Sequence, residues 1–157
     1  INYCMKNNKE IKPIELGNLY SSRDWSDAED FMVGIWRMLN QDIFDKHFNG
    51  VPKEYVLASN KTHTIKTFVE ESFKAIKING YWENNTNNEI NETFCYQNNS
   101  GEKILLVKIN PVFYRKCDLI KTCGNSLKIK YELGWQPKIE FKDLVKKMVE
   151  HDISIFK

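Results

Sequence analysis

Apolar side chains recur at helical spacing in three stretches of the chain, and each stretch predicts an amphipathic helix. The first helix covers residues 27–40, with Ser26 as N-cap and acidic residues in its first turn. The second begins after Thr64 and stops at Asn79–Gly80, and the third follows Gln136–Pro137. Their apolar faces are, in chain order, Phe31, Ile35, Met38 and Leu39; Ile65, Phe68, Val69, Phe73 and Ile76; Phe141, Leu144, Val145, Met148, Val149 and Ile153.

Shorter apolar runs between these helices predict strands. They are an edge strand in Pro13–Leu19, a buried strand at Tyr55–Ala58, and strands at Tyr81–Trp82, Ile104–Ile109 and Asp118–Ile120. A short helix after Ser126 ends at Gly134, whereas residues 41–53 and the Asn-rich residues 83–102 are expected to be loops. The pattern predicts a mixed α/β fold, and residues 1–157 are expected to form a single domain.

Composition narrows the possible partners. Hydrophobic residues make up 41% of the chain, so a core can form, and a net charge of +2 argues against a nucleic-acid partner. No apolar run approaches the roughly 20 residues of a membrane helix, so we expect no membrane partner. The four cysteines form no Cys-x-x-Cys pair and read as reduced thiols of a cytoplasmic protein, with no metal site. The isolated His47, His63 and His151 are expected at the surface or in caps.

Several catalytic signatures are absent from the sequence. The scattered glycines form neither a Gly-x-Gly-x-x-Gly turn nor a phosphate-binding loop, and no Tyr is followed four residues later by Lys. The sequence therefore predicts neither catalytic nor cofactor-binding residues in this chain.

Arginine is rare in this Lys-rich chain, and two of its three arginines lie at element boundaries. Arg23 precedes a helix N-terminus, and Arg115 follows a strand. A guanidinium group grips a phosphate through two hydrogen bonds, so both positions suit an anionic ligand. Asp118, three residues after Arg115, suits ribose hydroxyls. The alternative is that Arg23–Asp24 or Arg115–Asp118 are structural ion pairs.

Five motifs, in this order, resemble the C-terminal half of GDP-mannose 4,6-dehydratases, which belong to the extended short-chain dehydrogenase/reductase superfamily. They are Leu16-Gly17-Asn18, Arg23-Asp24-Trp25, Tyr114-Arg115, Gly124-Asn125-Ser126 with Lys128, and Leu133-Gly134-Trp135-Gln136-Pro137. The turn after Arg115 departs from the family pattern: Lys116, Cys117 and Asp118 stand where the family has Pro, Thr and Glu.

The resemblance implies a substrate-binding part that lacks the Rossmann half with its NADP site and catalytic residues. Arg23 and Arg115 would bind the GDP diphosphate and nearby sugar, and Asp118 would meet the ribose. The whole enzyme would be a lyase converting GDP-mannose to GDP-4-keto-6-deoxymannose, toward GDP-fucose, and this chain alone would be inactive. The expected partners are a GDP-sugar and the missing half. A second copy is also expected as a partner, because the helix after Trp25 would expose an apolar patch. The alternative is a non-catalytic nucleotide-binding or structural remnant.

Overall fold

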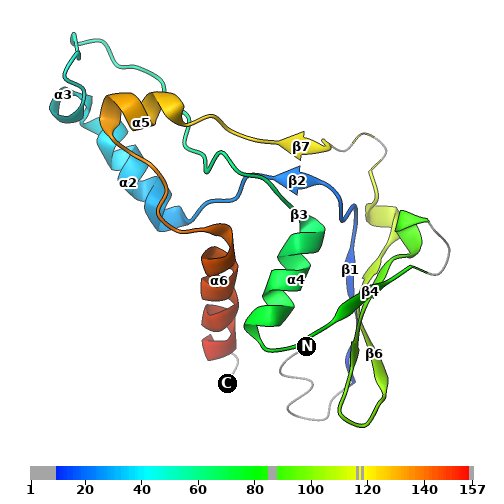
Figure 1. The fold of residues 1–157 in the computed structure, drawn as a ribbon. Coiled ribbons are helices and arrows are strands. Elements are labelled where there is room, and N and C mark those ends of the chain that lie inside the picture. Colours follow the sequence, from blue (N-terminus) through cyan, green and yellow to red (C-terminus); the bar gives the residue numbers. More distant parts are fainter. Residues whose placement is uncertain (1–9, 85–87, 116, 118, 156–157) are drawn as a thin grey trace. The chain divides into compact units, whose positions relative to one another are not determined.

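A computed structural model describes residues 10–84, 88–115, 117 and 119–155 (Figure 1). The chain divides into two compact units. Unit 1 comprises Ile1–Ser21, Thr64–Ile120 and Val145–Lys157, and unit 2 comprises Ser22–His63 and Lys121–Leu144. Helices and strands are mixed along the chain, which confirms the predicted α/β class. In the described part, no helix combines the length and apolarity needed to cross a membrane.

Unit 1 is built on a four-stranded sheet with strand order β1-β6-β5-β4 (Figure 1). Its strands are β1 (Ile14–Leu16), β4 (Tyr81–Glu83), β5 (Thr93–Gln97) and β6 (Lys103–Ile109). Strand β1 runs parallel to β6, with Ile14 opposite Val107, and the other two pairs are antiparallel. The predicted edge strand is therefore confirmed, and β6 is paired on both sides.

Helix α4 (Ile65–Ala75) covers the core of unit 1. Thr64 caps it as predicted, since its side chain accepts a hydrogen bond from the Thr67 N–H. The helix ends at Ile76, earlier than the predicted stop at Asn79–Gly80. Lys77 takes a left-handed conformation with φ of 62° there, and the Ile78 N–H bonds back to the Phe73 carbonyl at 3.0 Å. The buried core residues are Val69, Phe73, Ile78, Phe94, Leu106 and Val107.

The prediction of a loop over residues 83–102 is wrong in its centre. A 3-10 turn, η1 (Glu89–Asn91), leads into β5, where Phe94 and Cys95 are buried. These two side chains fill the core between polar neighbours, and the pairing of β5 with β4 and β6 satisfies the backbone. The high Asn content of the whole segment concealed this short strand.

Helix α2 (Ala28–Leu39) dominates unit 2. Its N-cap is Asp27, one residue after the predicted Ser26, because the Asp27 carboxylate accepts from the Glu29 N–H at 2.8 Å. The predicted apolar face is confirmed in part: Phe31 and Met38 pack against the cluster of Ile129, Leu133 and Trp135, whereas Leu39 is 79% exposed and Ile35 is 38% exposed. Gly34, which the prediction left out, is buried and lies against Leu57 and Trp135.

The predicted loop 41–53 begins with a short helix, α3 (Gln41–Phe44). The Gln41 side chain is buried and pairs with the backbone of Lys53, accepting from its N–H at 2.9 Å and donating to its carbonyl at 3.1 Å. The Lys53 ammonium in turn lies 2.6 Å from Asp45 and 3.1 Å from Glu132. These bonds give the segment a fixed path without a long helix or strand.

Tyr55–Ala58, predicted as a buried strand, form no strand. Tyr55 and Leu57 pack on the unit 2 core, whereas the alternate Val56 is 52% exposed. Among the described residues, Tyr55–Ala58 make no backbone–backbone hydrogen bond. Tyr55–Ala58 thus have the side-chain pattern of a strand, but among the described residues they pair with no strand of either sheet.

Six further elements complete the described part of the chain. They are β2 (Ser22–Arg23), β3 (His63–Thr64), η2 (Pro111–Phe113), β7 (Lys121–Thr122), α5 (Leu127–Leu133) and α6 (Phe141–Ile155). Helix α5 ends at Gly134, with φ of 65°, as predicted. The brief strand expected at 118–120 is wrong at Leu119–Ile120, because the pairing residues are Lys121–Thr122; Asp118 itself lies outside the described residues.

Candidate functional site

Arg23 lies in the two-residue strand β2 of unit 2, which runs parallel to β7 (Figure 1). In this pairing Ser22 is opposite Lys121 and Arg23 is opposite Thr122. The Arg23 side chain is half-buried, and its Nη1 donates to the Ser22 carbonyl at 2.9 Å. This predicted site residue is therefore held on a paired backbone.

The next residue, Asp24, accepts four hydrogen bonds from two other segments. Its Oδ1 receives the Ser59 N–H at 2.9 Å and the Ser59 hydroxyl at 2.6 Å. Its Oδ2 receives the N–H groups of Asn60 at 3.0 Å and Gly124 at 3.3 Å. We call Asp24, Ser59, Asn60 and Gly124 the Asp24 cluster. It joins the chain immediately after β2, the chain after residues 54–58 and the chain after β7.

Asn60 extends the Asp24 cluster to the start of α5. Its amide nitrogen donates to the Ser126 hydroxyl, and its amide oxygen accepts from the Ser126 N–H, both at 2.8 Å. Asn60 has a φ of 63°, a left-handed conformation that Asn tolerates better than most residues. Gly124 is equally constrained, because a Cβ there would lie 2.3 Å from the Ala58 Cβ.

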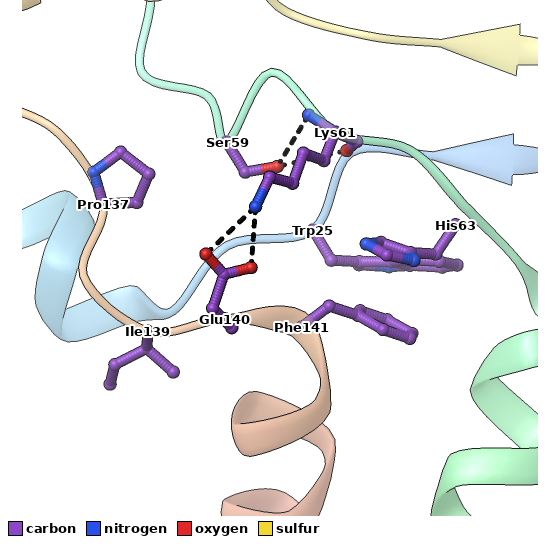
Figure 2. A pocket seen from close by; sticks show the side chains of 8 residues that line it. All are labelled: Trp25, Ser59, Lys61, His63, Pro137, Ile139, Glu140 and Phe141. Carbon is purple, nitrogen blue, oxygen red and sulfur yellow. Dashed lines mark hydrogen bonds and ion pairs between the residues drawn. The ribbon is translucent and has the colours of Figure 1, made fainter.

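A small pocket in unit 2 adjoins the Asp24 cluster at Ser59 (Figure 2). On one side three rings lie together: His63 is parallel to Phe141 with centroids 3.9 Å apart, and Trp25 stacks on Phe141 at 5.5 Å. On the other side the Lys61 ammonium bonds both oxygens of Glu140, at 2.9 and 3.0 Å. The pocket volume of about 30 Å³ suits a water molecule and is far too small for a nucleotide.

Burial lowers the pKa of His63, and the nearby Lys61 adds to this effect. The ring stack therefore favours the neutral imidazole. His63 is half-buried against Phe141, which corrects the prediction that it belongs to the surface or a cap.

Arg115 is exposed in unit 1, at the end of the turn that follows β6. Asn110 anchors this turn: its Oδ1 accepts from the Val112 N–H at 2.9 Å, and its Nδ2 donates to Glu15 at 2.7 Å. Gly17 lies close beneath it, since a Cβ there would be 2.6 Å from the Phe113 carbonyl oxygen. The turn that carries Arg115 is thus fixed to β1 and to the end of β6.

The structure describes two of the three predicted site residues, and these two belong to different units. Arg23 belongs to unit 2 and Arg115 to unit 1, so their meeting on one ligand stays a prediction. Asp118 lies outside the described residues. Sequence reasoning missed the roles of Ser59 and Asn60, although Asp24 and Gly124 stood within two of the recognised motifs.

Two other clusters of titratable groups hold loops in place. In unit 1 the Tyr20 hydroxyl donates to Glu92 at 2.8 Å, and this bond raises the pKa of Tyr20. In unit 2 burial and a bond to Glu132 raise the pKa of Tyr55 to about 12.

Known structures share this fold. RMD from Pseudomonas aeruginosa in complex with NADPH aligns with a TM-score of 0.64 and 16% identity, over 98% of this chain and 40% of that one. UDP-glucose 4-epimerase from Thermotoga maritima, with UDP-glucose, aligns with a TM-score of 0.60 and 15% identity, over 99% of this chain and 38% of that one. The fold is therefore that of the C-terminal part of an extended short-chain dehydrogenase/reductase.

Sequence comparison identifies the family. The family model described as GDP-mannose 4,6 dehydratase matches residues 2–148. The GDP-mannose 4,6 dehydratase of Dictyostelium discoideum is 37% identical over 90% of this chain, and that of Drosophila melanogaster is 34% identical over 95%. The chain belongs to the GDP-mannose 4,6-dehydratase family. It spans about a third of the length of these relatives, 36% and 34% respectively.

Proposed function

We propose that this chain is the part of a GDP-mannose 4,6-dehydratase that binds the GDP-sugar, with residues 1–157 acting as one substrate-binding domain. The observation that carries the proposal is the family match over residues 2–148, which includes Arg23, the last residue of β2, and Arg115, two residues after η2. Both arginines would bind the diphosphate and the nearby sugar, and Asp118 would meet the ribose. Guanidinium groups suit this role because they are always charged and bind phosphate oxygens in pairs.

The chain path supports a shared role for the two arginines. Arg115 precedes Lys121 by only six residues, and Lys121 pairs with Ser22, the neighbour of Arg23. The turn after β6 and the strand beside Arg23 are thus consecutive parts of one connection.

A Rossmann half, in the same or a separate chain, is the proposed partner of unit 2. Residues 54–58 have the side-chain alternation of a strand but no backbone partner among the described residues. The outer face of α2 is apolar, with Met32, Trp36 and Leu39 more than half exposed. A sheet that supplied a neighbouring strand and a helical layer would satisfy both features.

NADP belongs to that other half in our proposal. The chain has no glycine-rich turn and no Tyr-x-x-x-Lys pair, so its residues do not fit the cofactor. The whole enzyme would act in the cytoplasm as an NADP-dependent lyase, converting GDP-mannose to GDP-4-keto-6-deoxymannose for GDP-fucose synthesis. This chain alone would not turn over.

Titration of the 157-residue chain with GDP and GDP-mannose, by thermal shift and calorimetry, tests the proposal. Both ligands should raise the melting temperature. Arg115→Ala should weaken GDP binding by about 1.5–3 kcal/mol, the value of a hydrogen bond to a charged group.

Arg37→Ala is the matched control for Arg115→Ala. It removes the same charge, but Arg37 donates to the Leu133 carbonyl at 2.6 Å and lies over the Phe44 ring, so it should lower stability and spare GDP affinity. If neither ligand raises the melting temperature of folded wild-type protein or gives a heat of binding, then GDP-sugar binding by this chain is excluded. The chain is then better described as a structural remnant.

A further inference from the structure

We infer that Asp24 is a positioning residue, which fixes the backbone of Arg23 for binding the diphosphate of a nucleotide. This inference rests on the proposed function and adds Asp24 to Arg23, Arg115 and Asp118 as a residue that acts through Arg23. Asp24 does not need to touch the ligand: its carboxylate is already filled by donors from Ser59, Asn60 and Gly124.

The bonds of Asp24 hold both strands that frame Arg23. Arg23 is opposite Thr122, and Gly124, which donates to Asp24, is two residues after Thr122. The Ser59 and Asn60 bonds tie the same carboxylate to the chain that follows residues 54–58. Strand β2 lies between β3 and β7, and all three strands are only two residues long, so this small sheet alone holds Arg23 weakly. The Asp24 cluster supplies the missing restraint.

The donor set requires a carboxylate. All four partners of Asp24 donate, three through backbone N–H groups and one through the Ser59 hydroxyl. Asparagine has the same shape, but its NH₂ group would face either the Ser59 donors or those of Asn60 and Gly124. In either orientation donors of the cluster, most of them partly buried, lose their acceptor, and the turn after Arg23 must move.

The Asn60–Ser126 pair lies beside the Asp24 cluster and helps to show why the restraint from Asp24 acts on Arg23 in particular. It links the turn after residues 54–58 to the start of α5 through two bonds of 2.8 Å. The Asp24 cluster and this pair together join three connections on one side of unit 2. Of these, only the connection after β2 carries an arginine immediately before the cluster.

The test compares Asp24→Asn with wild type by GDP calorimetry and by NMR of arginine side chains. The three arginines give three Nε–H signals, which Arg→Lys variants assign. With wild type, GDP should shift the signals of Arg23 and Arg115. With Asp24→Asn, GDP should bind about tenfold more weakly, and only the Arg115 signal should respond.

Asp30→Asn is the matched control, because Asp30 is another carboxylate of unit 2 that accepts backbone N–H groups. Its Oδ2 receives those of Lys138 at 2.8 Å and Ile139 at 2.9 Å. This variant should be less stable but bind GDP as wild type does. A merely structural role for Asp24 would make the two variants behave alike.

Each outcome decides between the two proposals. If wild type binds GDP and folded Asp24→Asn binds it equally well, the positioning role is wrong and GDP binding stands. If wild type does not bind GDP, both fail. If Asp24→Asn does not fold, Ser59→Ala replaces it, since it removes the 2.6 Å hydroxyl bond to Asp24, together with the contacts of that hydroxyl with the Lys61 backbone, and leaves the Asp24 carboxylate in place. It should weaken GDP binding about threefold and reduce the Arg23 response, and unchanged binding would overturn the inference.

Discussion

Strand β6 and residues 54–58 have similar apolar sequences but different surroundings. β6 is paired with β1 on one side and β5 on the other, and Leu106 and Val107 are fully buried. In residues 54–58, Tyr55 and Leu57 pack on a core while Val56 between them is exposed, yet the segment has no backbone partner in the described part of the chain. The difference teaches that apolar alternation sets which side chains face a core, whereas a strand forms only when another edge is available.

Helices α4 and α2 repeat this contrast between the units. Within α4 the exposed residue is the charged Lys74, and Glu71, which pairs with it, is largely covered. The outer face of α2 carries Met32, Trp36 and Leu39, all more than half exposed. Unit 2 therefore presents an apolar helix face together with Tyr55–Ala58, a segment with no backbone partner in the described part of the chain. Such a combination is typical of a surface that another segment covers.

Hydrogen exchange should reveal the largest difference. The amides of β6 have carbonyl acceptors and lie in the core of unit 1, whereas those of Tyr55–Ala58 have no backbone acceptor among the described residues. We expect the latter to exchange at least about a thousandfold faster, since ladder amides open only at a cost of several kcal/mol. Equal protection in the two segments would mean that residues 54–58 acquire a partner in solution.

Truncation of one side chain in each segment should give the next largest effect. Leu106 is fully buried, so Leu106→Ala should lower the free energy of unfolding by about 2–5 kcal/mol. Val56 is 52% exposed, and Val56→Ala should cost less than about 1 kcal/mol. Urea unfolding measures both. A Val56→Ala cost as large as that of Leu106→Ala would contradict the contrast.

The sequence predicted those parts of the fold that depend on neighbouring residues. Thr64 and Gly134 bound helices as expected, and Asn110 caps the turn before Arg115. Periodicity was only partly right on α2, because the helix is apolar on more than one face and the small Gly34, not Ile35, meets Leu57 and Trp135. Only the packing partner decides which apolar face is buried.

The candidate site was predictable only in part. Arginine is rare in this chain, and Arg23 and Arg115 lie at expected element boundaries, so the sequence identified both as candidates. The Asp24 cluster, however, joins residues that are 35 to 100 positions apart in the chain. No local pattern contains that information. The family motifs did mark Asp24 and Gly124, and the fold adds the reason that they occur together.

The apolar face of α2 should make the chain self-associate, and charges on that face should reverse this. Met32→Lys with Leu39→Lys should weaken association by at least about tenfold, because both exposed side chains would have to bury a charge. Val112→Lys is the control in unit 1, where Val112 is 84% exposed. Light scattering across a concentration series reports the result. Monomeric wild-type protein at high concentration would show that α2 alone does not drive association.

The smallest effect should be a pH dependence that arises in unit 2. Burial lowers the pKa of His63 below its ordinary value of about 6.5, so the unfolded chain binds more protons than the folded chain just below that pH. Stability from His63 is therefore present above pH 6.5 and lost as the pH falls through the folded pKa. His63→Phe should keep the stack on Phe141 and flatten this part of the stability profile, as followed by urea unfolding between pH 5 and 7. The charges facing His63 from neighbouring segments are Lys61, Asp24, Glu140 and Lys142, and they remain in the variant. If the wild-type and His63→Phe profiles have the same slope, the acid sensitivity of unit 2 comes from those charges and not from the ring.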